Sequence, residues 1–582
     1  MQDFITNFVG KTHHQKLIKD MIHPEISITS APRSAWLSPF ALAVALMTGV
    51  ALCTQAADRK VKVTKRYLNY PITHTTDRHD ITFSIGNEVL CHTSARLATG
   101  KPDYWTFQDV SRWHGKTITI HYDGPQEALD RILLADTLCE GSTMGHEAER
   151  PQYHFSSRRG WLNDPNGLIY VQGVYHMYYQ HDPFDRDGGQ KHWGHAVSTD
   201  LMHWDERPDA LHPDEHGAIW SGSAVMDYDN TAGFNAKDGT PAMVVAYTVQ
   251  RPEKQTQYVA YSTDGGNTFT PYEGNPVIDS HEKWQTSDTR DPRMFWYAPG
   301  QHWVLVLNER EGHSIYNSTD LKHWTYESHI TGFWECPDLF ELPVDNNPND
   351  RKWVLWGASG TYMVGTFDGK QFTPLTPKQK NMGGGGYAAQ VFNGTQEHDG
   401  RVIKMTWGRI YYDRAPFNCV MLLPQEQLLK SRKGGGWELV SRPVQEVEAQ
   451  FDLATSGKDM TQEEANQMLA AYAGNDLLRL RLTLELTYAT DAGLTLGRQR
   501  LIDYDLNGNR LNGDFYATEQ PGSLTLDADV YVDRSVVEVF IDGGRYSYSF
   551  GRDTVGGKFD GYSIYGNQVK VKNLEVYRLR QS

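Results

Sequence analysis

Apolar and polar residues alternate along several stretches near both ends of the chain, which is the pattern of half-buried β-strands. Before residue 145 the stretches are Y-L-N-Y-P-I, D-I-T-F-S-I and K-T-I-T-I-H-Y. After residue 443 they include L-L-R-L-R-L-T-L-E-L-T-Y and D-A-D-V-Y-V-D-R-S-V-V-E-V-F-I-D-G-G, in which D-G-G is typical of a hairpin turn. We therefore predict a β-sandwich-like module over residues 58–148 and a C-terminal β-sandwich over residues 441–582.

Two departures from the strand pattern stand out in these end regions. Residues 140–151 are polar with glycine and proline, which predicts a linker. A helix is predicted near Thr461, because Thr461 can act as its N-cap with Glu464 three residues later.

The middle of the chain repeats one hairpin pattern. S-T-D begins at Ser198, Ser262 and Ser318, and a weaker copy, T-F-D, begins at Thr366. Each copy follows an apolar strand and precedes an aromatic residue, and the copies recur every 48 to 64 residues. A hairpin repeated at roughly 50 residues is typical of propeller blades. We predict an all-β protein whose residues 149–440 form a five-bladed β-propeller.

The N-terminus carries a nearly continuous apolar stretch from Ala35 to Cys53, preceded by Arg33. This arrangement is typical of a secretory signal, so residues 1–57 are predicted to be a targeting segment and the rest to be exported to the periplasm or cell surface. Cys53 could carry a lipid anchor, and the stretch is also long enough for an uncleaved membrane anchor. Translation could instead begin at Met21.

Composition limits the classes of ligand. The formal charge is −16 and no basic run occurs, which argues against a nucleic-acid partner. The five cysteines are widely spaced, so no zinc or redox motif follows, and we expect neither a metal nor a cofactor. Cys91 and Cys139 could form a disulfide, although free buried thiols are favoured.

Three acidic residues in the predicted propeller are each followed by proline at one or two positions. They are Asp164 in W-L-N-D-P-N-G, Asp291 in T-R-D-P-R and Glu335 in W-E-C-P-D-L-F. Proline fixes φ, so each acid would extend from a stiff turn. We expect the three acids at corresponding strand starts of successive blades, where they would converge on the propeller axis.

Two carboxylates in different environments are what the cleavage of a glycosidic bond requires. Asp164 lies between Asn163 and Asn166 and is expected to stay ionised as a nucleophile. Glu335 has Trp334 and Cys336 as partly apolar neighbours, as a general acid requires.

At these residues the sequence resembles glycoside hydrolase family 32, the family of invertases, inulinases and levanases. W-L-N-D-P-N-G, R-D-P and E-C-P match its three acidic blocks in order, and W-S-G-S-A, Y-A-A-Q and D-R-S-V-V-E-V-F-I-D-G-G match further blocks. The resemblance implies a five-bladed propeller with a β-sandwich, a retaining mechanism and no metal. It implies that Asp164 is the nucleophile, Glu335 the acid/base and Asp291 the transition-state stabiliser. The fructosyl-pocket residues that it implies are Asn163, Gln180, Trp193, Trp220, Ser221, Arg290, Tyr387 and Trp407.

The sequence departs from the family pattern in three places. Leu162 replaces the usual methionine, which we expect to matter little. A run of four glycines, residues 383–386, stands where an acidic residue is common, and we expect a looser pocket rim. The module before residue 152 resembles that of fructan hydrolases from Bacteroidetes-type bacteria, which favours a polymeric substrate.

We therefore expect retaining hydrolysis of terminal β-D-fructosyl bonds of fructans, levan or inulin, with sucrose as a further substrate. Two alternatives use the same features: a fructosyltransferase, and a non-catalytic fructan-binding protein, which would be expected to lack one of the three acids.

Overall fold

The computed structural model describes residues 56–516, 525–552 and 561–580, so the predicted targeting segment and Cys53 lie outside it. The described chain is built mostly of strands, as predicted, and none of its helices is long and apolar enough to cross a membrane.

The N-terminal module consists of two sheets that enclose a core of buried aliphatic and aromatic side chains, including Leu68, Tyr70, Ile81 and Ile120. Its alternating stretches form strands, as predicted. The first sheet contains β1 (Ala57–Lys62), β6 (Thr117–Tyr122), β3 (His79–Ile85) and β4 (Glu88–Ala95), and the second contains β5 (Tyr104–Asp109), β2 (Tyr67–Ile72) and β7 (Leu133–Ala135).

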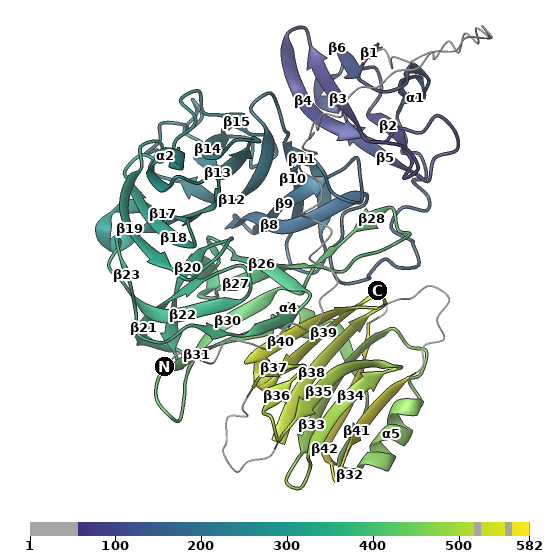
Figure 1. Ribbon diagram of the computed structural model, residues 1–582, viewed down its shortest axis with the longest axis vertical. Coiled ribbons are helices and arrows are strands. Elements are labelled where there is room, and N and C mark those ends of the chain that lie inside the picture. The colour runs from purple at the N-terminus through teal and green to yellow at the C-terminus, as the bar shows by residue number, and fades with distance from the viewer. Residues whose placement is uncertain (1–55, 517–524, 553–560, 581–582) are drawn as a thin grey trace, which may run out of the picture. The chain divides into compact units, whose positions relative to one another are not determined.

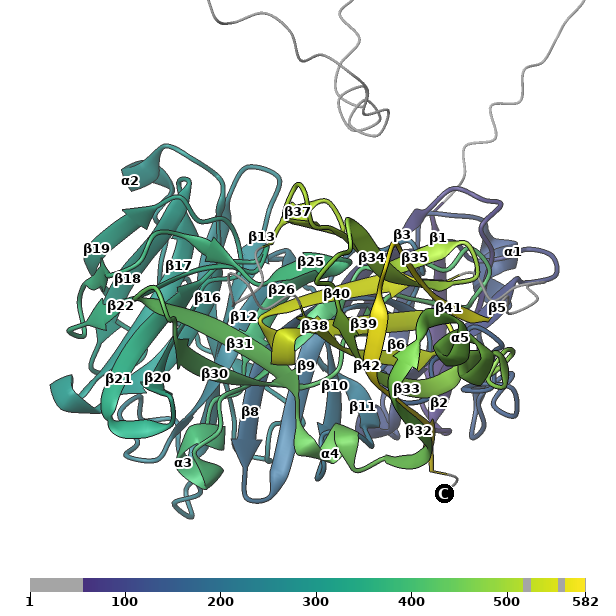
Figure 2. The ribbon, with the colours of Figure 1, turned by 90° about the horizontal axis from the view of Figure 1, so that it is seen from below.

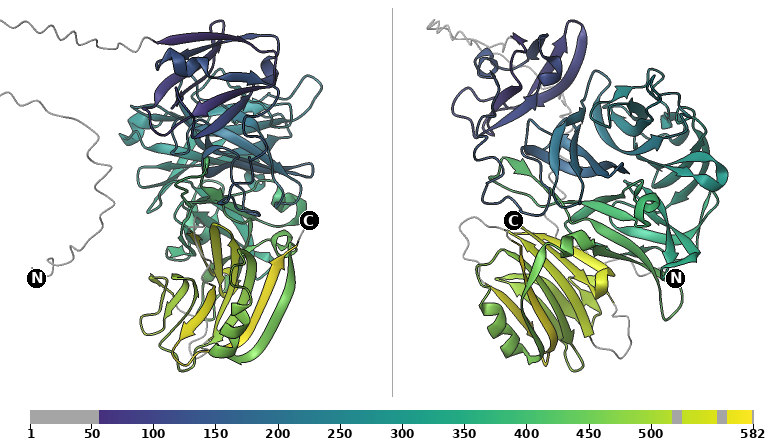
Figure 3. Two further views of the ribbon diagram at one scale, coloured as in Figure 1. Left: turned by 90° about the vertical axis from the view of Figure 1, so that its right-hand side faces the viewer. Right: turned by 180° about the vertical axis from the view of Figure 1, so that it is seen from behind.

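Five blades of four strands follow, arranged around a common axis in Figure 1 and, seen from behind, in Figure 3. Their innermost strands are β8, β12, β16, β20 and β26. From the axis outward the blades are β8 (Gly160–Val171), β9 (Val174–Asp182), β10 (His192–Ser198) and β11 (Asp205–Leu211); β12 (Ala218–Asp227), β13 (Ala242–Gln250), β14 (Gln255–Ser262) and β15 (Thr270–Pro271); β16 (Thr289–Tyr297), β17 (His302–Glu309), β18 (Gly312–Ser318) and β19 (Thr325–Thr331); β20 (Asp338–Val344), β21 (Asn347–Trp356), β22 (Thr361–Phe367) and β23 (Phe372–Pro374); β26 (Gly386–Val391), β27 (Ile403–Gly408), β30 (Gln425–Ser431) and β31 (Trp437–Pro443).

The repeated S-T-D segments form the predicted turns between the third and fourth strands of blades one to three. The Asp200 carboxylate accepts hydrogen bonds from the backbone N–H groups of Met202 and His203. Asp320 makes the same contacts two blades later, and Asp368 closes the weaker fourth copy in the same way. These side chains stand in for backbone partners in a tight turn, which is why the pattern could be found from sequence.

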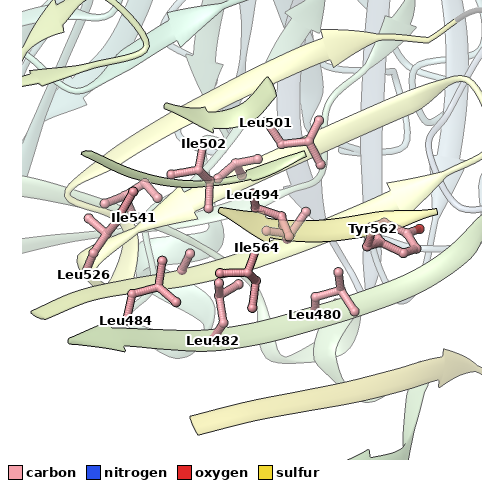
Figure 4. Packing of buried hydrophobic residues seen from close by; sticks show 14 of the residues in the cluster. Leu480, Leu482, Leu484, Leu494, Leu501, Ile502, Leu526, Ile541, Tyr562 and Ile564 are labelled. Atoms are coloured by element: carbon pink, nitrogen blue, oxygen red, sulfur yellow. The ribbon is translucent and has the colours of Figure 1, made fainter. Parts of the chain in front are cut away.

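The C-terminal domain is the predicted sandwich of two sheets, and Figure 4 shows its leucine-rich core between them. Helix α5 (Gln462–Ala470) begins at Thr461 with the predicted capping box and lies beside β41 and β42 in Figure 2. The sheets are β40 (Tyr546–Gly551), β39 (Val536–Ile541), β38 (Thr525–Asp533), β33 (Leu477–Glu485), β42 (Lys570–Leu579) and β32 (Phe451–Thr461), and β37 (Asp514–Phe515), β36 (Arg510–Leu511), β35 (Gln499–Asp505), β34 (Asp491–Leu496) and β41 (Tyr562–Gly566).

Buried contacts, both apolar and polar, hold the propeller to its two neighbours. Phe184, from the loop after β9, is part of the N-terminal module's core. His154, ahead of β8, contacts Asp533 and Glu538 of the sandwich at 2.9 Å each. The predicted linker is also fixed, because Arg150 is buried and its guanidinium lies 3.8 Å from the centre of the Phe417 ring.

Candidate active site

The three predicted acids meet at the propeller axis, although they do not come from successive blades. Asp164 lies on β8 of blade one, Asp291 on β16 of blade three, and Glu335 just before β20 of blade four. The innermost strand of blade two contributes Trp220 and Ser221 instead. The expectation of successive blades is wrong because β12 carries this W-S-G segment near its start, and the segment contains no acid.

Backbone conformation directs two of these acids toward the axis. Asp291, Glu335 and Cys336 have φ values of 65°, 52° and 41°, in the left-handed region that residues with a side chain rarely adopt. Strained residues persist where the surrounding structure fixes them, and they cluster at functional sites. Here the Asp291 N–H donates to Thr248 Oγ1 at 3.0 Å and the Glu335 N–H to Asn308 Oδ1 at 2.8 Å.

Asp164 is held by two side-chain donors. Ser221 Oγ donates to Asp164 Oδ2 at 2.6 Å, and Asn163 Nδ2 donates to Asp164 Oδ1 at 3.1 Å. Trp161 in turn orients Asn163, since its indole N–H donates to Asn163 Oδ1 at 2.8 Å. Burial raises the pKa of Asp164, and the bonds from Ser221 and Asn163 oppose that rise without cancelling it. The polar neighbours favour the ionised form of Asp164, and burial opposes them with the larger effect.

Cys336 connects the first two acids. Its backbone N–H donates to Asp291 Oδ2 at 2.9 Å, and its sulfur lies 3.6 Å from that oxygen and 3.7 Å from Asp164 Oδ2. Burial raises the pKa of Asp291 to about 7, against the attraction of Arg290. Asp291 therefore gains and loses its proton near neutrality.

Glu335 has a cationic and a phenolic donor, one on each oxygen. Arg290 donates to Oε1 at 2.6 Å, and Tyr387 Oη donates to Oε2 at 2.5 Å. The Arg290 guanidinium also lies 5.9 Å from the Trp220 ring centre and 5.4 Å from that of Trp334. Burial and this bond to Glu335 raise the pKa of Tyr387, so the phenol remains a donor.

The predicted pocket residues fall into two sets. Asn163, Trp220, Ser221, Arg290 and Tyr387 surround the acids as described. Trp193 and Gln180 instead lie behind the site with 0% and 2% of their surface exposed. The Trp193 indole N–H donates to the Trp220 carbonyl at 3.0 Å, so Trp193 supports β12. Trp407 packs edge-on against Trp161 and Tyr387.

Sequence reasoning missed residues that shape the site from other strands. Asn308 anchors the Glu335 backbone, and Gln390 joins β26 to β8 and β12 by accepting from Leu168 N and donating to Gly222 O. Tyr411 is 59% exposed and stacks on Trp161, with ring centres 6.0 Å apart. Of these three residues, only Gln390 had a signal in the sequence, because it ends the Y-A-A-Q block. Asn308 and Tyr411 lie outside the motifs identified above, so the sequence did not indicate their roles.

The glycine run does not loosen the rim as expected. Residues 382–384 form a short strand, β25 (Met382–Gly384), which pairs in parallel with β40 of the sandwich. Gly384 has φ 67°, and a Cβ there would lie 2.4 Å from the Ser549 carbonyl oxygen. Glycine thus allows the sandwich edge to approach the rim closely.

The chemistry of the donor atoms would also permit a cation at one place in the site. One oxygen each of Asp164 and Asp291 and the Cys336 sulfur lie within 4.8 Å of one another. Both Asp oxygens already accept protein hydrogen bonds, from Ser221 and from Cys336 N. The four described cysteines, including Cys91 and Cys139, are free thiols.

Carboxyl groups gathered at one site, as at the axis of this propeller, are what glycoside hydrolases use to cleave a glycosidic bond. The sequence model described as "Glycosyl hydrolases family 32 N-terminal domain" matches residues 154–443. The chain is 35% identical to a levanase from Bacillus subtilis over 75% of this chain and 71% of the levanase. It is 32% identical to an extracellular exo-inulinase from Aspergillus niger, over 72% of this chain and 93% of that protein.

Solved structures agree with these relatives. An exo-inulinase from Aspergillus awamori aligns with a TM-score of 0.63 at 26% identity, covering 75% of this chain and 99% of that one. A fructofuranosidase from Schwanniomyces occidentalis, in a complex with fructosylnystose, aligns with a TM-score of 0.64 at 25% identity over the same shares. The chain belongs to glycosyl hydrolase family 32, and it is a glycoside hydrolase.

Proposed function

We propose that this protein is a retaining β-fructosidase that releases terminal β-D-fructosyl units from fructans, with Asp164 as nucleophile, Glu335 as acid/base and Asp291 as stabiliser of the transition state. The observation that carries the proposal is the convergence of the three acids at one axial site, each with its own hydrogen-bond donors. The levanase and exo-inulinase relatives support a fructosyl substrate.

The reaction has two displacements. An Asp164 oxygen forms a bond to the anomeric carbon while the bond from that carbon to the leaving oxygen breaks, and Glu335 gives its proton to the leaving oxygen. Glu335 then removes a proton from water, whose oxygen replaces Asp164 on the carbon and frees fructose. Each displacement inverts the configuration at the anomeric carbon, so the two together retain it.

The remaining residues have supporting roles in this scheme. Ser221 and Asn163 fix the attacking oxygens of Asp164, which limits their motion before bond formation. Arg290 and Tyr387 orient Glu335. Asp291, as a carboxyl that can accept or share a proton, is suited to bind hydroxyls of the fructosyl ring.

Export is part of the proposal. The apolar stretch from Ala35 to Cys53 would direct the protein out of the cytoplasm, with Cys53 as the candidate lipid attachment residue. The A. niger relative is described as extracellular. An exported enzyme would meet polymeric fructan outside the cell.

The test is the pair Asp164→Asn and Glu335→Gln, assayed on levan, inulin and sucrose with product sizing. Each should lower kcat by about a thousandfold or more, whereas Asp229→Asn, at an exposed aspartate of blade two, should leave it unchanged. Reaction of the wild type in aqueous methanol should give the β-methyl fructoside. Full activity of Asp164→Asn, or formation of the α-product, would contradict the proposal.

A further inference from the structure

A second pocket lies away from the acids, between the N-terminal module and blade one. It has a volume of about 280 Å³, close to the lower end for ligand pockets. One wall comes from β2 and β5, with Tyr67, Phe107 and Asp109; the other comes from β11, with Glu206 and Asp209. Figure 1 shows the module beside this blade. We call this cavity the module pocket.

The module pocket is distinct from the active site. Its propeller wall is β11, the fourth strand of blade one, whereas Asp164 lies on β8, the first. Three strand spacings separate them, which is roughly 14 Å. A ligand in the module pocket would therefore leave the axial acids accessible.

Most of the charged groups that line the module pocket are already paired, each pair within one wall. Arg66 Nε contacts Asp109 Oδ2 at 2.9 Å, and Arg158 Nε contacts Glu206 Oε2 at 3.1 Å. His181 Nδ1 contacts Asp209 Oδ1 at 2.8 Å. Five arginines and four carboxylates line the pocket altogether. Burial lowers the pKa of His181 but Asp209 raises it to about 9, so His181 is a sixth cation, and Arg159 is paired outside the pocket with Glu147 at 2.7 Å. Arg112 contacts His212. Once these pairs are counted, the walls carry an excess of about one positive charge, which repels a free cation and is small for a phosphate or polyanion site.

The same walls suit a neutral ligand rich in hydroxyl groups. A guanidinium has five N–H donors and a carboxylate several acceptor sites, so each pair keeps capacity for adjacent hydroxyls. Fixing these groups in pairs also lowers the entropic cost of binding. Tyr67 and Phe107, half-buried and in edge-to-face contact at 5.9 Å, add apolar surface for the C–H groups of a sugar.

The anchoring of the module keeps this pocket open and rigid. Phe184, at its floor, is buried in the module's core, and Thr106 Oγ1 donates to the Pro183 carbonyl at 2.5 Å. Arg159 Nε donates to the Trp105 carbonyl at 2.9 Å. The walls are thus fixed relative to each other by buried contacts below the pocket.

We propose that the module pocket is an accessory, non-catalytic binding site for a segment of a neutral fructan chain. Binding there would hold the polymer while its end occupies the axial site, and two linked contacts raise the apparent affinity above that of either alone. The identity of the sugar rests on the proposed function, whereas the preference for a neutral polyol follows from the pocket itself.

The test uses the Asp164→Asn background, so that polysaccharide is bound without being cut. Migration through native gels containing levan or inulin measures retention. Arg158→Ala and Phe107→Ala should each weaken retention by about fivefold or more. Arg351→Ala is the matched control, because it removes a similarly exposed arginine from an ion pair with Glu341 on blade four, and retention should not change.

A second measurement does not depend on these variants. Amide hydrogen exchange of the Asp164→Asn protein with added polysaccharide should show protection of β5 (Tyr104–Asp109) and β11 (Asp205–Leu211) in addition to the axial strands. Unchanged retention in both pocket variants, or protection limited to the axial strands, would overturn the inference. Absence of any fructoside cleavage by the wild type would instead overturn the proposed function.

Discussion

At the residue scale, the active site places three acids in partly dry surroundings and supplies each with specific donors. Burial of a carboxylate favours its neutral form, and at Asp164 and Asp291 hydrogen bonds to the carboxylate oppose this effect of burial on the pKa. For Asp164 the main donor is Ser221, at 2.6 Å. The serine therefore controls the charge of the proposed nucleophile.

Ser221→Ala tests this control. Loss of a hydrogen bond that lowers the pKa of Asp164 should raise that pKa further, so the ionised nucleophile would form only at higher pH. We expect the acidic limb of the kcat/KM profile to move up by about one pH unit, the size of a charge-assisted hydrogen bond. Ser359→Ala, at an exposed serine of blade four, should not move it. An unshifted limb in Ser221→Ala would show that Ser221 does not set the charge.

Asp291 gives a prediction about stability. Its pKa is raised from 3.8 to about 7 in the folded protein, so the folded state holds a proton that the unfolded chain releases between these values. Ionising buried Asp291 lowers the free energy of unfolding. This loss has its full size above pH 7 and is absent below pH 4. Asp291→Asn should thus raise the free energy of unfolding at pH 8, on the order of 1–4 kcal/mol, while activity is lost. Denaturant unfolding at pH 8 and pH 4 measures the difference; an equal effect at both pH values would refute the assignment.

At the element scale, local patterns were predicted well and contacts distant in sequence were not. The S-T-D turns close on their own backbone, so Asp200 and Asp320 could be interpreted within five residues of sequence. The three active-site acids could be predicted because a proline follows each of them at one or two positions. The burial of Trp193 behind β12 could not be found, since it depends on how two blades pack. The pairing of β25 with β40 joins residues more than 160 positions apart, and no local signal specifies such a partner.

Gly384→Ala tests that pairing. A methyl group would meet the Ser549 carbonyl oxygen in a backbone conformation unfavourable to alanine, so β25 should separate from β40. We expect a loss of about 1–3 kcal/mol in the free energy of unfolding. Gly434→Ala is the control, because its Cβ would meet no atom within 4 Å and its φ is not in the left-handed region. Equal stability of the two variants would show that the strand pairing contributes little.

At the scale of the whole molecule, one buried cluster joins the start of the propeller to the sandwich. Asp533 accepts hydrogen bonds from the backbone N–H groups of residues 152–154 and from His154 Nδ1, while Glu538 contacts His154 Nε2. Both ring nitrogens therefore face carboxylates, which requires a protonated imidazole. The propeller and the sandwich are therefore joined through the positive charge of His154, which depends on pH.

The sign of this dependence is the same as that of Asp291, because each group holds a proton in the folded state that the unfolded chain has already released. Burial alone would lower the pKa of His154, but its bonds to Asp533 and Glu538 outweigh burial and raise it from 6.5 to about 9. The stabilisation is complete below pH 6.5, declines above it and is lost as the pH rises through 9, a change of about 3 kcal/mol. In calorimetry the wild type should lose thermal stability between pH 7 and pH 9.5. His154→Gln should be less stable at pH 7 and lack that loss, since it has no proton to release. His203→Gln, at an exposed histidine paired with Asp200, should behave as the wild type. If His154→Gln keeps the wild-type pH slope, the junction between propeller and sandwich does not depend on this charge.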